Sequence, residues 1–162
     1  MSSPTVSGTG VMLAERPALP VCAPGLYMRH RDRGFVAHIT ASELSLSTVR
    51  GLTATVLMAY GADRESAATA QLVVSELVGN AQRACGDHVP LVVEVYVTAF
   101  GIAVTVHDPA PELLPRRSEV AVDSDTAESG RGLTLLDLLA PGWCIEFSMV
   151  GKQIRCHIGS AE

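Results

Sequence analysis

Residues 91–108, LVVEVYVTAFGIAVTVHD, constrain the fold of this chain more than any other stretch. Four apolar residues alternate with more mixed ones in its first half: Leu91, Val93, Val95 and Val97. This period of two is typical of a strand that buries one face. A short turn at 99–101 separates it from a second apolar run, so the stretch predicts a β-hairpin.

Two segments before this hairpin have helical periodicity. The first begins at a cap, Ser42 or Ser45, and continues until Gly61. Its apolar stripe comprises Leu46, Val49, Leu52, Val56 and Leu57. The second begins at Asp63 as N-cap and ends near Gly86. Its broad apolar face comprises Leu72, Val73, Leu77, Val78 and Ala81.

The other elements complete the fold prediction. FVAHI (35–39) predicts a strand, 133–139 a helix, and the residues around Gly151 a last hairpin. Residues 109–129 contain three prolines and little periodicity, which fits either a functional lid or a tolerated surface loop. The order of elements predicts an α+β fold, a two-layer sandwich with helices on one face of a largely antiparallel mixed sheet.

Length and charge narrow the class of protein. The 162 residues suit one domain, expected at 25–162, after an arm at 1–24 that four prolines predict to be disordered. The net charge of −5 argues against direct binding of nucleic acid, which usually requires a basic surface.

The four cysteines, Cys22, Cys85, Cys144 and Cys156, have no CxxC spacing, so a zinc site is not expected. The sequence also shows no signal peptide and no apolar run long enough to cross a bilayer. We therefore expect a cytoplasmic protein with reduced thiols and no membrane segment.

Glu76 and Asn80 are the first candidate site residues. They are four residues apart, about 40° from each other around a helix, so they point the same way. An amide oxygen is a ligand that suits Mg²⁺, and a carboxylate can orient or deprotonate a hydroxyl group. The spacing alone favours the plainer alternative, that both side chains lie at a solvent edge.

Two further candidates follow later in the chain. Asp108 ends an apolar strand, where a carboxylate can accept a hydrogen bond from an amino group such as that of adenine. The alternative is an Asp that starts a turn before proline. Gly130, Arg131 and Gly132 precede a helix, whose free N–H groups suit phosphate, or they form a flexible junction.

Taken in order, these motifs resemble a known family. ExxxN at 76–80, Asp108 after a strand, a long loop and GRGL at 130–133 resemble the ATP-binding domain of the gyrase, chaperone and histidine-kinase superfamily, the Bergerat fold. Within it, SELVGNAQRA (75–84) and SGRGLTLLDLLAPGW are similar to the anti-sigma-factor serine kinases and small actinobacterial regulatory ATPases. The resemblance covers about residues 34–158.

The resemblance implies ATP and Mg²⁺ as cofactors and gives each motif a role. Asn80 would hold Mg²⁺, Glu76 would act as general base toward a protein serine, and Asp108 would bind the adenine amino group. Arg83 matches a basic position just after the Asn.

The same resemblance assigns the later motifs. Gly130, Arg131, Gly132 and Leu133 would wrap the phosphates, with 109–129 as the ATP lid. Two positions depart from the family pattern: Ala84 replaces a His, and Gln153 stands where a Thr is often found near the adenine.

The activity implied is that of an anti-sigma factor with serine/threonine protein kinase activity. Its partners would be a sigma factor and a STAS-type anti-sigma antagonist, and it would form a homodimer. The alternative is a non-catalytic nucleotide-sensing module, in which ATP orders the lid and thereby favours one protein partner. Ala84, Gln153 and the acidic lid motivate this alternative.

Overall fold

The computed structural model describes residues 16–20, 22–109 and 134–159. The predictions for the arm before residue 16, the lid after Pro109, and Gly130, Arg131, Gly132 and Leu133 lie outside the described residues. The described strands form one sheet in the order β1-β2-β3-β4-β6-β5, with every neighbouring pair antiparallel. They are β1 (Leu26–Arg31), β2 (Gly34–Thr40), β3 (Pro90–Thr98), β4 (Gly101–Asp108), β5 (Cys144–Ser148) and β6 (Gly151–Gly159).

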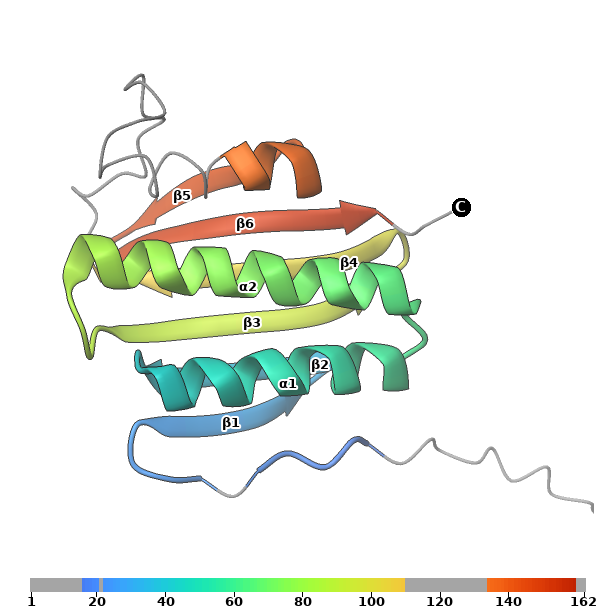
Figure 1. Ribbon diagram of the computed structural model, residues 1–162, viewed down its shortest axis with the longest axis horizontal. Coiled ribbons are helices and arrows are strands. Elements are labelled where there is room, and N and C mark those ends of the chain that lie inside the picture. The colour runs from blue at the N-terminus through green and yellow to red at the C-terminus, as the bar shows by residue number, and fades with distance from the viewer. Residues whose placement is uncertain (1–15, 21, 110–133, 160–162) are drawn as a thin grey trace, which may run out of the picture.

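Two long helices, α1 (Glu43–Ala59) and α2 (Arg64–Cys85), cover one face of this sheet (Figure 1). A short helix at 134–139 lies near the β5 edge. The predicted α+β sandwich is confirmed, although the described sheet is entirely antiparallel rather than mixed. Within the described residues, no helix has the length and hydrophobicity needed to cross a membrane.

The ends of both helices follow the predicted capping chemistry. Ser42 caps α1 through a capping box, in which its hydroxyl accepts from the Ser45 N–H at 3.1 Å. Asp63 caps α2 by accepting from the Ser66 N–H at 2.8 Å. Gly61 and Gly86 follow the two helices at φ +94° and +89°, a conformation that glycine adopts without strain.

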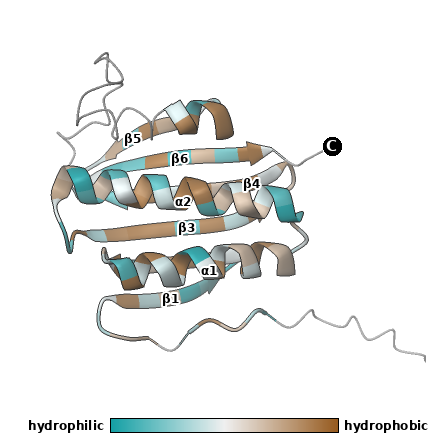
Figure 2. Ribbon diagram, in the orientation of Figure 1, coloured by the Kyte–Doolittle hydropathy of each residue, from teal (hydrophilic) through white to brown (hydrophobic). Residues whose placement is uncertain are grey.

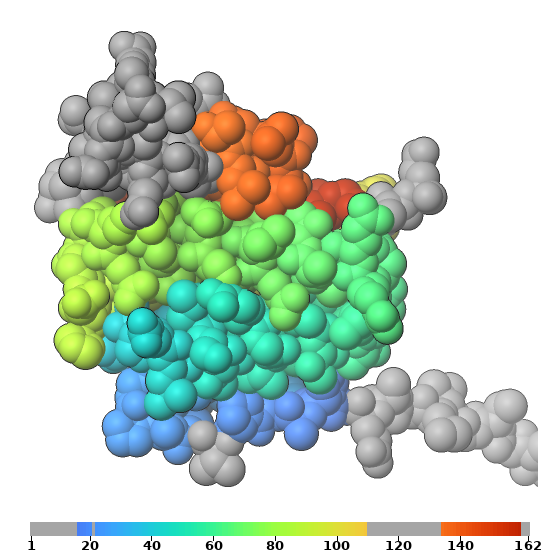
Figure 3. Space-filling view, viewed as in Figure 1, coloured from blue at the N-terminus to red at the C-terminus, as the bar shows by residue number. Residues whose placement is uncertain are grey.

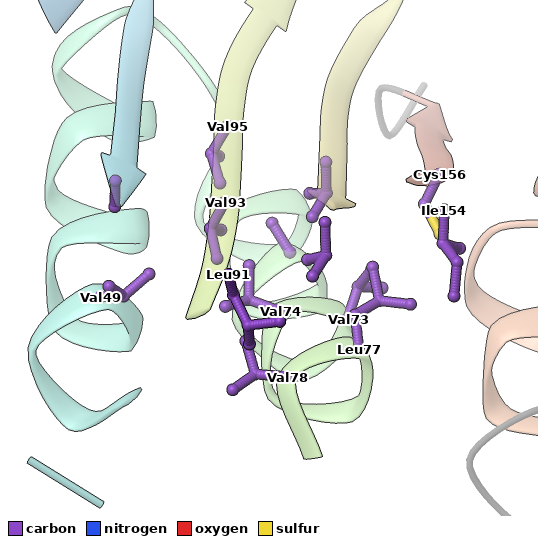
Figure 4. Close-up of a cluster of buried hydrophobic side chains, with 14 of the residues drawn as sticks. Val49, Val73, Val74, Leu77, Val78, Leu91, Val93, Val95, Ile154 and Cys156 are labelled. Carbon is purple, nitrogen blue, oxygen red and sulfur yellow. The ribbon is translucent and has the colours of Figure 1, made fainter. Parts of the chain in front are cut away.

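The core lies between α2 and the sheet. In Figure 4, apolar side chains of α2 meet those of β3 and β6, including Leu77, Val93 and Ile154, all at most 4% exposed. Figure 2 shows mostly hydrophobic residues along β3 and mixed character along α2. The predicted apolar faces therefore pack against each other, as an amphipathic helix on a half-buried sheet requires.

The two helices lie side by side over the sheet (Figure 3). Arg50 of α1 donates to the Ser75 hydroxyl of α2 at 2.7 Å, and the Gln71 amide donates to the Arg50 carbonyl at 3.0 Å. One side of α2 therefore contacts α1.

Strand β1 is an addition to the prediction, which placed no strand before residue 35. It pairs with β2 from Leu26↔Ile39 to Arg31↔Gly34 and forms one edge of the sheet. Met28 is its one fully buried residue, because an edge strand covers little of the core. The period-two signal on which the prediction depended is therefore weak there.

Candidate functional site at one end of the sheet

Three elements meet at one end of the molecule. In Figure 1 the C-terminal end of α2, the last residues of β4 and the first residues of β6 lie at the same end. The antiparallel pairing of β4 with β6 sets Asp108 directly opposite Lys152. Residues from distant parts of the sequence therefore come together here.

Glu76 and Asn80 lie on the side of α2 that faces away from α1. Relative to Ser75, which bonds to α1, they are rotated by about 100° and 140° around the helix. Both are half-buried, neither fully in the core nor on the open surface. The alternative that both side chains lie at a solvent edge therefore holds only in part, because each residue is partly buried.

Among the buried side-chain nitrogen and oxygen atoms that the structure describes, one has no hydrogen-bond partner, and it belongs to Asn80. Its Nδ2 is buried and unpaired, while its Oδ1 accepts from the Arg83 guanidinium. A buried donor without a partner is costly, and such a group often marks a place where a ligand binds. The Asn80 amide can therefore donate a hydrogen bond to a polar group that the described residues do not supply.

Arg83 reaches Asn80 by crossing over Gly79. A Cβ atom added at Gly79 would lie 3.2 Å from the Arg83 Nη1, a tight contact. Glycine therefore makes room for the guanidinium beside Asn80. The predicted grouping of Arg83 with Asn80 is present, with Arg83 exposed.

Asp108 is buried at the end of β4 and forms an ion pair that the sequence did not predict. The Lys152 Nζ donates to the Asp108 Oδ1 at 3.1 Å, and the two side chains are only 3% and 4% exposed. The carboxylate is held in place by a cation on the neighbouring strand.

Gly151 brings the start of β6 close to the end of β4. Its φ is +144°, and a Cβ atom there would lie 1.9 Å from the Asp108 carbonyl oxygen. Only glycine fits this position without moving the backbone. The contact between Lys152 and Asp108 depends on this close approach.

Gln153 does not join the other predicted site residues. It is the register partner of His107 on β4 and Glu146 on β5. Because neighbouring residues of a strand point to opposite faces, Gln153 lies on the face away from the helices, and Lys152 lies on the face of Asp108. The β6 residue that contacts Asp108 is therefore Lys152.

Comparison with known proteins agrees with this geometry. The family model described as a histidine kinase-like ATPase domain matches residues 39–155, more than half of the chain. The chain belongs to this family. No curated protein matched the sequence. The Bergerat-fold expectation is thereby confirmed, and the match includes Glu76, Asn80, Asp108 and Lys152.

The residues present fit the cofactors that a histidine kinase-like ATPase domain implies. Mg²⁺ bound to nucleotide needs only one or two protein ligands, because phosphates and waters supply the rest. Asn80 offers an amide oxygen, and Glu76 a carboxylate one turn before it. No cluster of three or more His, Cys, Asp or Glu that could hold a metal occurs among the described residues, so a cage made of protein alone is not indicated there.

A separate hollow on this ATPase domain lacks the charged side chains expected at a site for Mg·ATP. It has a volume of about 560 Å³ and lies between the segment before β1 and the start of α1, with Ser42, Thr48 and His88 in its wall. It shares no residue with the site at α2, β4 and β6. It carries no carboxylate and no lysine or arginine.

Proposed function

We propose that this protein is an anti-sigma factor with ATP-dependent serine/threonine kinase activity toward a STAS-type antagonist. The observation that carries the proposal is the enclosed edge of α2, where Glu76 lies one turn from Asn80 and its unpaired buried amide. Membership of the ATPase family and the resemblance of SELVGNAQRA to the anti-sigma kinases support it. The proposed partners are a sigma factor, the antagonist and a second copy of the chain.

Each residue has a task in this proposal. Glu76 makes no hydrogen bond or ion pair within the described residues, so its carboxylate is available to take the proton of a serine hydroxyl. Asn80 would hold Mg²⁺ through Oδ1, and the Asp108 carboxylate would accept a hydrogen bond from the amino group of adenine. Bound Mg·ATP would supply the phosphoryl group.

Phosphotransfer to the antagonist tests the proposal. The wild-type protein should label a serine of a STAS-type antagonist from γ-labelled ATP. Glu76→Gln should reduce the rate by about 10²-fold or more, because a positioned base contributes about that much, while ATP affinity remains. The matched control is Glu65→Gln, an exposed carboxylate in the first turn of the same helix. Equal rates for Glu76→Gln and the wild type would refute the assignment.

A non-catalytic nucleotide-sensing module is the second candidate. The contact between Arg83 and Asn80 favours it, because the amide oxygen that would hold Mg²⁺ is already accepting a hydrogen bond. In this case ATP would change the affinity for a protein partner without any phosphate transfer. Detection of a phosphoserine on the partner decides against it.

A further inference from the structure

The hairpin of β5 and β6 ends in a group of exposed apolar side chains. Phe147, Met149 and Val150 are 60%, 104% and 70% exposed, and we call these three residues the apolar tip. The other exposed large hydrophobic residues that the structure describes are scattered along the chain, and none adjoins another. Single residues of this kind are normal on a protein surface, whereas a patch of them often marks a place where another molecule binds.

The turn itself does not require these apolar residues. Ser148 and Gly151 are register partners, so Met149 and Val150 are the two central residues of the turn. The Ser148 hydroxyl accepts from the Val150 N–H at 3.3 Å and lies 3.1 Å from Nε2 of His107 on β4. Ser at the first position and Gly at the fourth favour a turn whose central positions tolerate most residues. Turns are usually polar, so the apolar residues here need another reason.

The apolar tip lies at the end of the sheet that carries the candidate site. Gly151, which ends the turn, approaches the Asp108 carbonyl oxygen so closely that an added Cβ atom would lie 1.9 Å from it. The tip is therefore next to the point where β4 ends. The C-terminal end of α2 lies at the same end of the molecule (Figure 1), and Glu76 and Asn80 belong to the C-terminal half of that helix.

This location identifies the partner. A serine can transfer its proton to the Glu76 carboxylate only when the two groups come within hydrogen-bond reach, so the acceptor protein must approach this end of the domain. Apolar side chains that it covers there leave water, which favours association. An anionic membrane is a poorer match, because it attracts Lys and Arg, and the only charged residue within 144–151 is Glu146.

We propose that the apolar tip is the docking surface for the acceptor protein of the phosphotransfer, and that it enters an apolar hollow near the acceptor serine. This inference rests on the proposed function, because it takes the acceptor protein from it. The tip contributes affinity for that protein and has no part in the transfer of the phosphoryl group. Its loss therefore changes the KM for the acceptor protein and not kcat.

Steady-state phosphotransfer to the STAS-type antagonist, measured as a function of antagonist concentration, tests the inference. Met149→Ser and Val150→Ser should each raise the KM for the antagonist about tenfold, the factor expected when one apolar side chain no longer contributes to the interface. The values of kcat and the affinity for Mg·ATP should stay unchanged, as for any contact made equally before and during the reaction. Met149→Leu, which keeps an apolar side chain, should keep the wild-type KM.

The matched control is Phe100→Ser. Phe100 is 82% exposed in the turn before β4, at the end of that strand opposite to Asp108. This variant removes a comparable apolar side chain from a turn far from the tip along the strand. It should leave the KM for the antagonist at the wild-type value.

Three results overturn the inference. The KM is unchanged in both Met149→Ser and Val150→Ser; or it rises equally in Phe100→Ser, so that the effect is not specific to the tip; or the wild type binds vesicles of phosphatidylglycerol and Met149→Ser does not, which makes the tip a membrane contact. In each of these cases the antagonist is still phosphorylated, so the proposed function stands.

Direct binding separates this inference from the proposed function. If the wild type transfers no phosphate to the antagonist, the proposed kinase activity is refuted, and calorimetric titration of the antagonist into the protein with Mg·ATP tests the tip alone. Binding that is about tenfold weaker in Met149→Ser supports docking at the tip. Equal binding by the two proteins, or no binding by the wild type, overturns it.

Discussion

Cys156 shows how its surroundings change the chemistry of one side chain. Burial in the core, and secondarily the neighbouring Cys144, raise the pKa of the Cys156 thiol from 9.0 to about 12. Above pH 9 the unfolded thiol loses its proton while the folded one keeps it. The stability that this group contributes is complete below about pH 9 and is lost as the pH rises toward 12.

Urea unfolding between pH 8 and pH 11 measures this effect. We expect the free energy of unfolding to fall above about pH 9, by at most about 1.4 kcal/mol per pH unit for this one group. Cys156→Ala should remove that part of the slope, whereas Cys22→Ala, at an exposed cysteine, should leave it. An unchanged slope in Cys156→Ala contradicts the prediction.

The sequence pointed to Glu76, Asn80 and Asp108 as candidate site residues, whereas it gave no sign of the buried Lys152 beside Asp108. Gln153, the β6 residue that the resemblance implies, lies on the opposite face of the sheet from Lys152, because neighbouring residues of a strand point to opposite faces. The burial pattern of β6 places Lys152 on the buried face. Ile154, Cys156 and Ile158 are buried, and Lys152 is the next residue of that series when one counts back in steps of two. A charged residue in that series is easily passed over because buried lysines are rare.

At the scale of single elements, helix caps were the most predictable feature. Asp63 accepts from the Ser66 N–H and hydroxyl at 2.8 and 2.7 Å. Asp63→Ala should destabilise the protein by about 1 kcal/mol, because an N–H at the start of α2 loses its acceptor. The fall in Tm should be about 2–4 °C. Asp87→Ala, in the exposed turn after α2, is the control and should have little effect.

Edge strands were the least predictable elements. Strand β3 was predicted because its apolar residues alternate, and β4 because an apolar run follows the turn at 99–101. Three of the six residues of β1 are Arg or His, and its apolar residues do not alternate. The strand depends on its pairing with β2, which local sequence does not reveal. Local sequence patterns therefore predicted the interior strands of the sheet and missed the edge strand β1.

For the molecule as a whole, ligand binding should appear as added stability. If Mg·ATP binds the folded chain alone, a concentration one hundred times the Kd adds about 2.7 kcal/mol. Thermal melting with and without Mg·ATP measures this. Asn80→Ala should weaken the Mg²⁺-dependent part of the shift, whereas Asp87→Ala should show the full shift. No shift at millimolar Mg·ATP means that nucleotide is not a ligand of this protein.

The position of β6 has a consequence for how the protein is made. Although β6 is the last strand in the sequence, it lies inside the sheet, between β4 and β5. Until its residues leave the ribosome, β4 is an unprotected edge and the buried Asp108 has no Lys152 opposite it. The nascent chain therefore cannot form the ion pair between Asp108 and Lys152 during translation of the helices and the central hairpin, and this half of the domain is completed only when Gly151–Gly159 has emerged.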